Sequence, residues 1–348
     1  MHDPTDTVTT ANPGGHQPFR LSNPTPSDAT VMGGCYVRGM ANMTKLGTTG
    51  LDVHRLCLGG NVFGWSADER ESVAVLDVYA AVGGNFIDTA DTYGGGASES
   101  IIGRWAAARG NRDALVIATK VAKKTDRPGL SAANIRIAAE ESLARLGTDH
   151  IDLYYAHEDD ESVPLEETLG AFDALVREGK VRYIAASNYT APRLSEALAV
   201  SAREGFAGYA ALQNHYNLLE RAEYEAGVGP LLAETGIPSL PYFSLARGFL
   251  AGKYRPGVKV ESVRAAKADT YRTERGYTLL AVLDEIAAAH GVSVAAVSLA
   301  WLAGRPTVAA PIASARTTEQ LAELLPFVDL ELSPDETAAL DKVSEPEA

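Results

Sequence analysis

Residues 85–93 read Asn-Phe-Ile-Asp-Thr-Ala-Asp-Thr-Tyr, a short β-rich apolar run that turns polar at its end. Similar runs recur along the chain with amphipathic, helix-like stretches between them. Such alternation is typical of a parallel sheet covered by helices. The candidate strands are eight: Leu56–Gly60, Asn85–Asp88, Leu115–Thr119, Ile151–Ala156, Tyr183–Ser187, Tyr209–Gln213, Ile237–Pro241 and Val308–Ile312.

The spacing of these runs favours a closed barrel. Their starts are separated by 29, 30, 36, 32, 26, 28 and 71 residues, so the first six intervals each fit one strand–helix unit and the last contains an insertion. Eight units in about 270 residues predict an α/β fold of the (β/α)8 TIM barrel kind. A doubly wound open sheet is the alternative, but Gly59-Gly60-Asn61-Val62-Phe63-Gly64 does not match the G-x-G-x-x-G turn that it needs.

Elements around the barrel can also be predicted. An N-terminal hairpin over Thr44–His54 would close the bottom of the barrel, and the insertion before strand eight would hold helices over Tyr277–His290 and Ser293–Ala303 after an irregular loop, 251–275. Ser66 to Glu69 has the pattern of a capping box that starts a helix. A further helix is predicted over Ser131–Leu146, from a serine cap to Gly147.

Composition excludes several classes of function. The net charge is −14 and the pI about 5.0, so the chain should repel phosphate backbones and anionic membranes, and no nucleic-acid partner is expected. Two cysteines, Cys35 and Cys57, make neither a disulfide framework nor a metal site. No apolar run of about 18 residues and no leader-like N-terminus occur. We therefore expect a cytoplasmic protein with no membrane span, and its oligomeric state is not readable.

The first 42 residues differ from the rest. They are rich in Pro, Thr, Asn and Gly and show no periodic apolar pattern. We interpret residues 1–42 as a disordered tail and residues 43–348 as the barrel domain. Met40 and Met43 stand just before the first regular segment, which leaves open whether the tail belongs to the natural protein.

Candidate chemistry collects where the second, third and fourth strands end. The carboxyl ends of barrel strands form one rim, where active sites lie. Strand two ends at Asp88 and Tyr93 follows shortly after it, Lys120 stands at the end of strand three, and His157 stands at the end of strand four. Each residue alone has an ordinary structural explanation, as a cap, a packing ring, a solvated charge or a structural histidine. At successive strand ends they would meet at one mouth.

These four side chains can reduce a carbonyl together. Hydride addition leaves an alkoxide that needs a proton, and an unperturbed tyrosine, with a pKa of about 10, is a poor donor at neutral pH. A lysine ammonium beside Tyr93 would lower the pKa of the phenol. Asp88 can balance a buried Lys120. His157 can hydrogen-bond the carbonyl oxygen and orient it.

At this point the sequence resembles the aldo-keto reductase superfamily, over about residues 46–343. The stretches that carry the resemblance are 85–94 (NFIDTADTYG), 117–120 (IATK), 152–157 (DLYYAH), 178–184 (EGKVRYI) with Ser187-Asn188, 212–214 (LQN) and 252–254 (GKY). The five-residue spacing from Asp88 to Tyr93 fits the family's catalytic tetrad. The combined pattern is highly specific, although each piece alone is weak.

The resemblance implies roles for particular residues. Tyr93 would be the general acid, Lys120 and Asp88 would tune it, and His157 would steer the carbonyl. NADPH would be the cofactor, because a guanidinium at Arg316 suits a 2′-phosphate. The implied cofactor contacts are Gly60, Asn61, Ser187, Asn188, Gln213, Tyr242, Leu245, Ala246, Arg247, Ser314, Arg316 and Gln320.

Three departures from the family pattern bear on these contacts. Gly59-Gly60-Asn61 stands where relatives often carry Thr after the first Gly, which puts the cofactor contacts of Gly60 and Asn61 in doubt. Leu324 stands where relatives often carry Asn, which puts the contacts to the adenine end of the cofactor in doubt. Glu158-Asp159-Asp160-Glu161 follows the family His, where a polar-proline motif is common. We interpret this acidic run as a mild bias against anionic substrates, with a solvated loop as the alternative.

The resemblance leaves alternatives for the function. The first expectation is an NADPH-dependent reductase of a small-molecule aldehyde or ketone. Reduction of a carbon–carbon double bond or of a nucleotide-linked sugar intermediate is an alternative, although retention of His157 favours carbonyls. A cofactor-sensing binding subunit, like the family's potassium-channel β subunits, is another. The substrate and the physiological direction cannot be read, and Phe63, Trp65 and the 251–275 loop are the candidate pocket residues.

Overall fold

The computed structural model describes residues 42–260 and 265–346 of the chain. The tail expected at residues 1–42 lies outside this range except for Asn42, so the domain boundaries stay a prediction. The strands are β1 (Met43–Lys45), β2 (Asp52–His54), β3 (Cys57–Gly59), β4 (Phe86–Asp88), β5 (Val116–Val121), β6 (Lys123–Lys124), β7 (Arg127–Pro128), β8 (Ile151–Ala156), β9 (Val181–Ser187), β10 (Tyr209–Gln213) and β11 (Ile312–Ala313).

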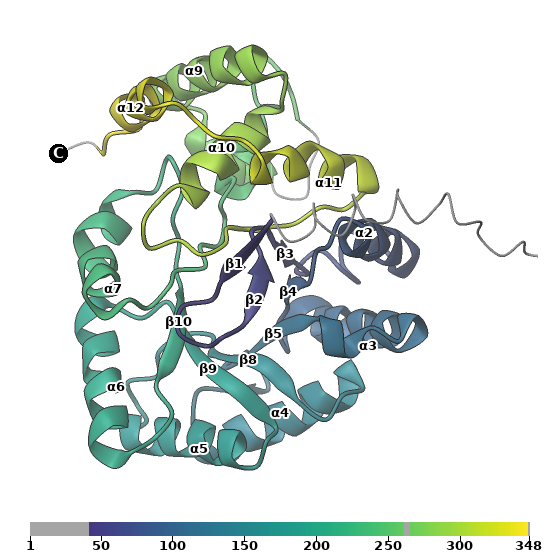
Figure 1. Ribbon diagram of the computed structural model, residues 1–348, viewed down its shortest axis with the longest axis vertical. Helices are drawn as coiled ribbons and strands as arrows, with labels where there is room; N and C mark the ends of the chain where they lie inside the picture. Colours follow the sequence, from purple (N-terminus) through teal and green to yellow (C-terminus); the bar gives the residue numbers. More distant parts are fainter. Residues whose placement is uncertain (1–41, 261–264, 347–348) are drawn as a thin grey trace, which may run out of the picture. The chain divides into compact units, whose positions relative to one another are not determined.

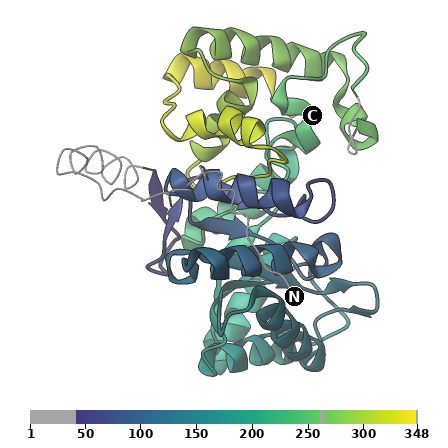
Figure 2. The same cartoon turned by 90° about the vertical axis from the view of Figure 1, so that its right-hand side faces the viewer.

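The α-helices stand mostly between these strands. They are α2 (Glu69–Ala81), α3 (Ala97–Arg109), α4 (Ala132–Leu146), α5 (Leu165–Arg177), α6 (Ala191–Glu204), α7 (Gly229–Thr235), α8 (Ala265–Ala268), α9 (Glu274–His290), α10 (Val294–Ala303), α11 (Thr318–Leu324) and α12 (Pro334–Val343). Figure 1 shows α2 to α7 following one another around the outside of the sheet, with α9 to α12 completing the ring. Figure 2 gives the same arrangement from the side, with α2 and α3 lying next to each other.

The central sheet has the order expected of a (β/α)8 barrel. Among the described residues, seven parallel strands pair in the order β10-β9-β8-β5-β4-β3-β11. Apart from β6 and β7, which form a separate two-stranded sheet, each strand from β3 to β10 therefore lies beside the strands that precede and follow it along the chain, and β11 pairs with β3. The fold class predicted from the sequence is confirmed.

The seventh position of the barrel is held by a segment too irregular to be assigned as a strand. Ser239 forms parallel bridges to Leu212 on one side and to Val308 on the other. Pro238 and Pro241 flank it, and a proline has no N–H for a sheet ladder. The N–H groups that remain serve both neighbours: Ser239 donates to Thr307 at 2.6 Å and Leu240 donates to Leu212 at 2.8 Å. The barrel thus closes with fewer hydrogen bonds at this position.

Helix ends follow the local signals, with one correction. Ser131 caps α4 by accepting from the Asn134 N–H, and Gly147 ends it in the left-handed conformation. The capping box predicted from Ser66 to Glu69 is wrong, because Asp68 is the cap of α2 and Glu71 completes the box. Ser and Asp cap helices equally well, so only the start of the helix decides between them.

The hairpin β1–β2 plugs one end of the barrel, as predicted. Its antiparallel register pairs Met43 with His54. Leu46 and Val53 are fully buried in a cluster with side chains of the barrel interior, which include Phe86, Leu153 and Leu240. The barrel is therefore a filled core, and its opposite end is left to form a site.

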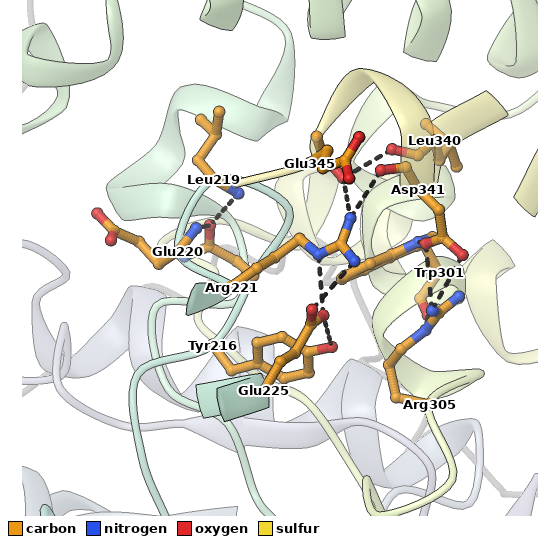
Figure 3. Close-up of polar contacts among 12 residues, drawn as sticks. Tyr216, Leu219, Glu220, Arg221, Glu225, Trp301, Arg305, Leu340, Asp341 and Glu345 are labelled. Atoms are coloured by element: carbon orange, nitrogen blue, oxygen red, sulfur yellow. Dashed lines mark hydrogen bonds and ion pairs between the residues drawn. The ribbon is translucent and has the colours of Figure 1, made fainter. Parts of the chain in front are cut away.

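The C-terminal helix α12 is tied to the loop after β10 through Arg221 (Figure 3). The Arg221 guanidinium donates to both carboxylate oxygens of Glu225, at 2.8 and 3.1 Å, and to the backbone oxygen of Asp341 at 2.8 Å. It also lies 5.5 Å from the ring of Trp301, on α10. One side chain thus joins three elements that are far apart in the sequence.

No single helix in the described part of the chain is long and apolar enough to cross a membrane. Helices α9 and α10 are long and apolar enough only when taken together, and the pair is bent by 96°.

Candidate active site

The exits of β4, β5 and β8 bring the four predicted catalytic side chains together. The three strands are adjacent, with Asp88 opposite Ala118 and Lys120 opposite Tyr155 in the ladders. Because parallel strands end on the same rim, residues in the last positions of each strand or just past it converge there, as Asp88 and Lys120 do from within β4 and β5. Tyr93 follows β4 in a tight turn that continues into α3, and His157 directly follows β8.

Lys120 is the centre of this group. Its side chain is fully buried, and Nζ lies 2.8 Å from Asp88, 2.6 Å from the Thr89 carbonyl oxygen and 3.4 Å from the Tyr93 hydroxyl. Burial alone would lower the pKa of Lys120, but the charge of Asp88 and the contact with Tyr93 outweigh it and raise the pKa above its ordinary value. Lys120 therefore stays an ammonium at neutral pH beside the phenol oxygen.

His157 lies on the other side of Tyr93. The two rings meet edge to face, with centroids 6.0 Å apart. Burial, together with the charges of Lys120 and Lys123, lowers the pKa of His157 well below its ordinary value. The imidazole is thus neutral at neutral pH and can act as a hydrogen-bond donor rather than as a cation.

A cavity of about 720 Å³ opens above this group. Asp88, Tyr93 and His157 lie on its wall, and Lys120 lies beneath them. Ten of the twelve expected cofactor contacts line it as well: Asn61, Ser187, Asn188, Gln213, Tyr242, Leu245, Arg247, Ser314, Arg316 and Gln320.

A network of amide and hydroxyl groups joins the tetrad to the neighbouring wall. Gln213 donates to Asp88 at 2.9 Å, and the Ser187 hydroxyl donates to the backbone oxygen of Gln213 at 2.9 Å. Asn188 has a left-handed backbone with φ of 60°, donates to the His157 backbone oxygen at 2.9 Å and accepts from the Tyr242 hydroxyl at 2.7 Å. These contacts fix the orientation of a polar surface before any ligand arrives.

The next stretch of wall is made of backbone held in an uncommon conformation. Phe243, Ala246 and Arg247 have positive φ angles of 50°, 46° and 58°. Non-glycine residues persist in this region only where their surroundings enforce it, and such residues cluster at ligand sites. The Arg247 guanidinium lies 4.3 Å from the centre of the Phe243 ring, which holds its charge at the wall.

The far end of the cavity is formed where β11 meets β3. Ser314 donates to the Asn61 side chain at 2.9 Å, across 253 positions of sequence. The backbone N–H of Arg316 donates to Gln320 at 3.0 Å, while the Arg316 side chain has no ion-pair partner among residues 42–260 and 265–346. Glu323 and Leu324 complete this end.

Some expected residues lie elsewhere. Gly60 and Ala246 do not line the cavity, although Gly59 and Leu245 beside them do. Phe63 is fully buried in the core, and Trp65 is 57% exposed and outside the lining, so neither is a pocket residue. Of the residues in the 251–275 loop that the structure describes, Ala251, Gly252 and Lys253 line the cavity, as expected, and the others do not.

The acidic run after His157 does not line the cavity. None of residues 158–161 lines the wall. Glu158 pairs with Lys123 at 3.3 Å, Asp159 pairs with Arg193 at 2.8 Å, and Asp160 accepts from the Leu130 N–H at 2.8 Å. Glu158 nevertheless reaches a lining residue, Lys123, so the interpretation of this run as a mild bias against anionic substrates stays a prediction.

Sequence reasoning missed several wall residues, among them Ser66, Thr92, Lys123, Phe243, Ser244 and Glu323. Lys123 stands two residues past the end of β5 at Val121 and could have been found by extending the Lys120 motif into its loop. Phe243 and Ser244 line the wall because of the left-handed turn that follows Tyr242, which no local sequence signal predicts.

Comparisons with known proteins agree with this geometry. The sequence profile of the Aldo/keto reductase family matches residues 55–345. The chain is 38% identical over 302 residues to the uncharacterized oxidoreductase YrpG of Bacillus subtilis, over 83% of this chain and 91% of that protein. It is 32% identical over 304 residues to the norsolorinic acid reductase stcV of Emericella nidulans, over 82% and 77%, and 32% identical over 336 residues to the aldo-keto reductase AMT2 of Alternaria alternata, over 85% and 90%. With a family match over most of its length and oxidoreductases among its relatives, the chain belongs to the aldo/keto reductase family.

Proposed function

We propose that this chain is an NADPH-dependent reductase that converts an aldehyde or ketone into the alcohol, with Tyr93 as the proton donor. The observation that carries the proposal is the contact of the Tyr93 hydroxyl with a buried ammonium, Lys120, on the wall of a cavity that also presents His157. It joins a proton donor to the charge that stabilises the donor after the proton has left.

The cavity fits a nicotinamide dinucleotide. Its volume of about 720 Å³ is in the range of small-molecule and cofactor sites. Near the tetrad, Ser187, Asn188 and Gln213 offer the mixture of donors and acceptors that a carboxamide requires. At the far end, the Arg316 guanidinium, which has no ion-pair partner in the described part of the chain, can take a phosphate in its fork.

The residues near Tyr93 divide the work of the reaction. When bound, NADPH supplies the hydride that the carbonyl carbon accepts. The neutral His157 donates a hydrogen bond to the carbonyl oxygen and holds it near the Tyr93 hydroxyl. Tyr93 gives its proton to that oxygen as charge develops there, so hydride and proton together yield the alcohol.

Lys120 and Asp88 support Tyr93 without contacting the substrate. The Lys120 ammonium, 3.4 Å from the phenol oxygen, stabilises the negative charge that remains on Tyr93. Asp88 balances the ammonium at 2.8 Å and is itself held by Gln213. The buried charges thus form a chain in which each member has a partner, as a water-poor site requires.

Oxidation of NADPH by an aromatic aldehyde or an o-quinone tests the proposal. The wild-type protein should turn over with NADPH preferred to NADH. Tyr93→Phe should lose at least about a hundredfold in kcat while still binding NADPH, because general-acid catalysis is worth about 10²–10⁴-fold. Tyr277→Phe, whose hydroxyl accepts a hydrogen bond from Arg272 outside the cavity, is the matched control.

Either of two results would contradict the proposal. Retention of most of the rate in Tyr93→Phe would remove the general-acid role. An absence of turnover with reactive carbonyls, while NADPH still binds tightly, would favour the cofactor-sensing role or a nucleotide-linked sugar substrate instead.

A further inference from the structure

The charged side chains on the cavity wall are unevenly divided. Four cations line it, namely Lys123, Arg247, Lys253 and Arg316, against two carboxylates, Asp88 and Glu323. Asp88 is already neutralised by Lys120. A cavity with this balance attracts anions, and the dinucleotide phosphates account for the cations away from the tetrad.

Lys123 is the cation at the tetrad end. It follows Lys120 by three residues, just after β5 ends at Val121, and its charge acts on His157. Between Val121 and Lys123, Ala122 has a positive φ of 122°, a strained conformation for a non-glycine residue. The Ala122 carbonyl accepts the Gly129 N–H at 2.8 Å, which fixes the bend. The strained residue turns the chain from β5 into the β6–β7 hairpin that begins with Lys123.

The other cations of that hairpin are occupied away from the cavity. Lys124 and Arg127 share the Glu141 carboxylate, at 2.9 and 2.7 Å. Neither lines the cavity. The hairpin therefore presents one ammonium, that of Lys123, to the wall near His157.

The partner of Lys123 is weakly held and replaceable. Glu158 lies 3.3 Å away, and the two side chains are 35% and 48% exposed. Exposed ion pairs of this kind contribute little to the stability of the fold. Glu158 itself does not line the cavity. A ligand carboxylate can thus take its place on Lys123 without disturbing the fold.

We propose that Lys123 is a specificity-determining residue that selects carbonyl substrates carrying a carboxylate or similar anionic group away from the reacting carbonyl. The inference rests on the proposed function and names its substrate class. It reverses the bias expected from the acidic run that follows His157, because Glu158 serves as an exchangeable counter-ion rather than as a repelling wall charge.

A pair of substrates that differ in charge tests this. We would measure kcat/KM with saturating NADPH for 4-carboxybenzaldehyde and for its methyl ester, methyl 4-formylbenzoate. In Lys123→Met the ratio of kcat/KM, acid over ester, should fall about tenfold, mainly through KM, the size expected for losing one hydrogen bond to a charged group. In Glu158→Gln the ratio should rise, since the competing carboxylate is gone. Lys124→Met, on the same hairpin but paired with Glu141, should leave the ratio as it is.

The outcomes separate this inference from the proposed function. Turnover of both aldehydes with a ratio that Lys123→Met and Glu158→Gln leave unaltered would overturn the role of Lys123 while the reductase stands. Without turnover of either aldehyde, calorimetry with the product alcohols, 4-(hydroxymethyl)benzoate and its methyl ester, decides the same question. A wild-type preference for the acid that Lys123→Met abolishes supports the inference, and equal Kd values for the two alcohols contradict it. Raising the ionic strength should weaken the acid preference of the wild type and have little effect in Lys123→Met.

Discussion

Asp91 is a buried carboxyl that the proposed chemistry does not use, and replacing it should change how stability depends on pH. The residue is 1% exposed, and neither of its carboxylate oxygens has a hydrogen-bond partner among the described residues. Burial, reinforced by the nearby Glu99 carboxylate, raises its pKa from 3.8 to about 6, although Lys124, Arg145 and Lys120 oppose the shift. The folded protein therefore holds this proton more tightly than the unfolded chain does.

The sign and size of the effect follow from that shift. A raised carboxyl pKa makes stability fall as the pH rises from about 4 to about 6, and the loss is complete above pH 6. Two pKa units correspond to about 3 kcal/mol. Asp91→Asn removes the titration but keeps the shape and leaves a neutral polar group at the same place. The difference in unfolding free energy, variant minus wild type, should therefore grow by about 2 kcal/mol between pH 4 and pH 8.

Guanidinium unfolding followed by circular dichroism across this pH range measures the difference directly. We compare how the difference in unfolding free energy changes with pH, rather than its absolute value. This comparison removes the pH-independent free-energy cost of burying the introduced amide. Asp113→Asn, at an exposed position, is the matched control. A pH profile for Asp91→Asn that does not differ from that of the control would refute the reasoning, since it would mean that the Asp91 carboxyl titrates alike in the folded and unfolded chains.

Two further substitutions test the far end of the cavity and the C-terminal helix. Arg316→Ala should weaken NADPH binding by about tenfold to a hundredfold, the range for hydrogen bonds to a charged group, and should change the Kd of NADH much less. Fluorescence titration measures both Kd values. Equal losses of affinity for the two dinucleotides would show that Arg316 does not contact the 2′-phosphate. Arg221→Ala should lower the free energy of unfolding by about 2–3 kcal/mol, because its side chain is only 11% exposed, and its loss leaves Glu225 with the Tyr216 hydroxyl as its remaining donor and the Asp341 carbonyl without the Arg221 hydrogen bond. Arg203→Ala, which breaks ion pairs of a 57% exposed side chain, should change the urea midpoint far less, and equal effects would count against the anchoring of α12.

The parts of the fold that sequence could predict are those with local or periodic causes. Strand exits could be placed because apolar runs stop at Asp88, Lys120 and His157, and parallel strands bring their ends to one rim. Helix ends could be placed where a glycine takes a left-handed conformation, as at Gly147. The order of the sheet followed from the repeat length.

What could not be predicted depends on contacts between distant segments. The side-chain directions of Phe63 and Trp65 are set by a loop that folds back on itself through a bridge between Phe63 and Ala67. The Phe63 ring therefore enters the core, and the Trp65 ring faces outward. The two unpartnered oxygens of Asp91 arise from how α3 and α4 pack around it. Likewise, the strain at Ala122 that brings Lys123 to the wall has no signature in the residue itself.

The hydrogen bond between Asn61 and Ser314 has a consequence for how the protein is made. All four tetrad side chains lie within the first 157 residues. The far end of the cavity, in contrast, forms only when β11 pairs with β3, and β11 follows β3 by more than 250 positions in the sequence. Closing so long a loop is slow compared with forming neighbouring strand–helix units. A nascent or truncated chain would thus carry the reactive groups without the end of the cavity that is proposed to bind a dinucleotide. Dinucleotide binding would then report on complete folding, and a ligand that binds only the closed barrel would hold its first and last strands together.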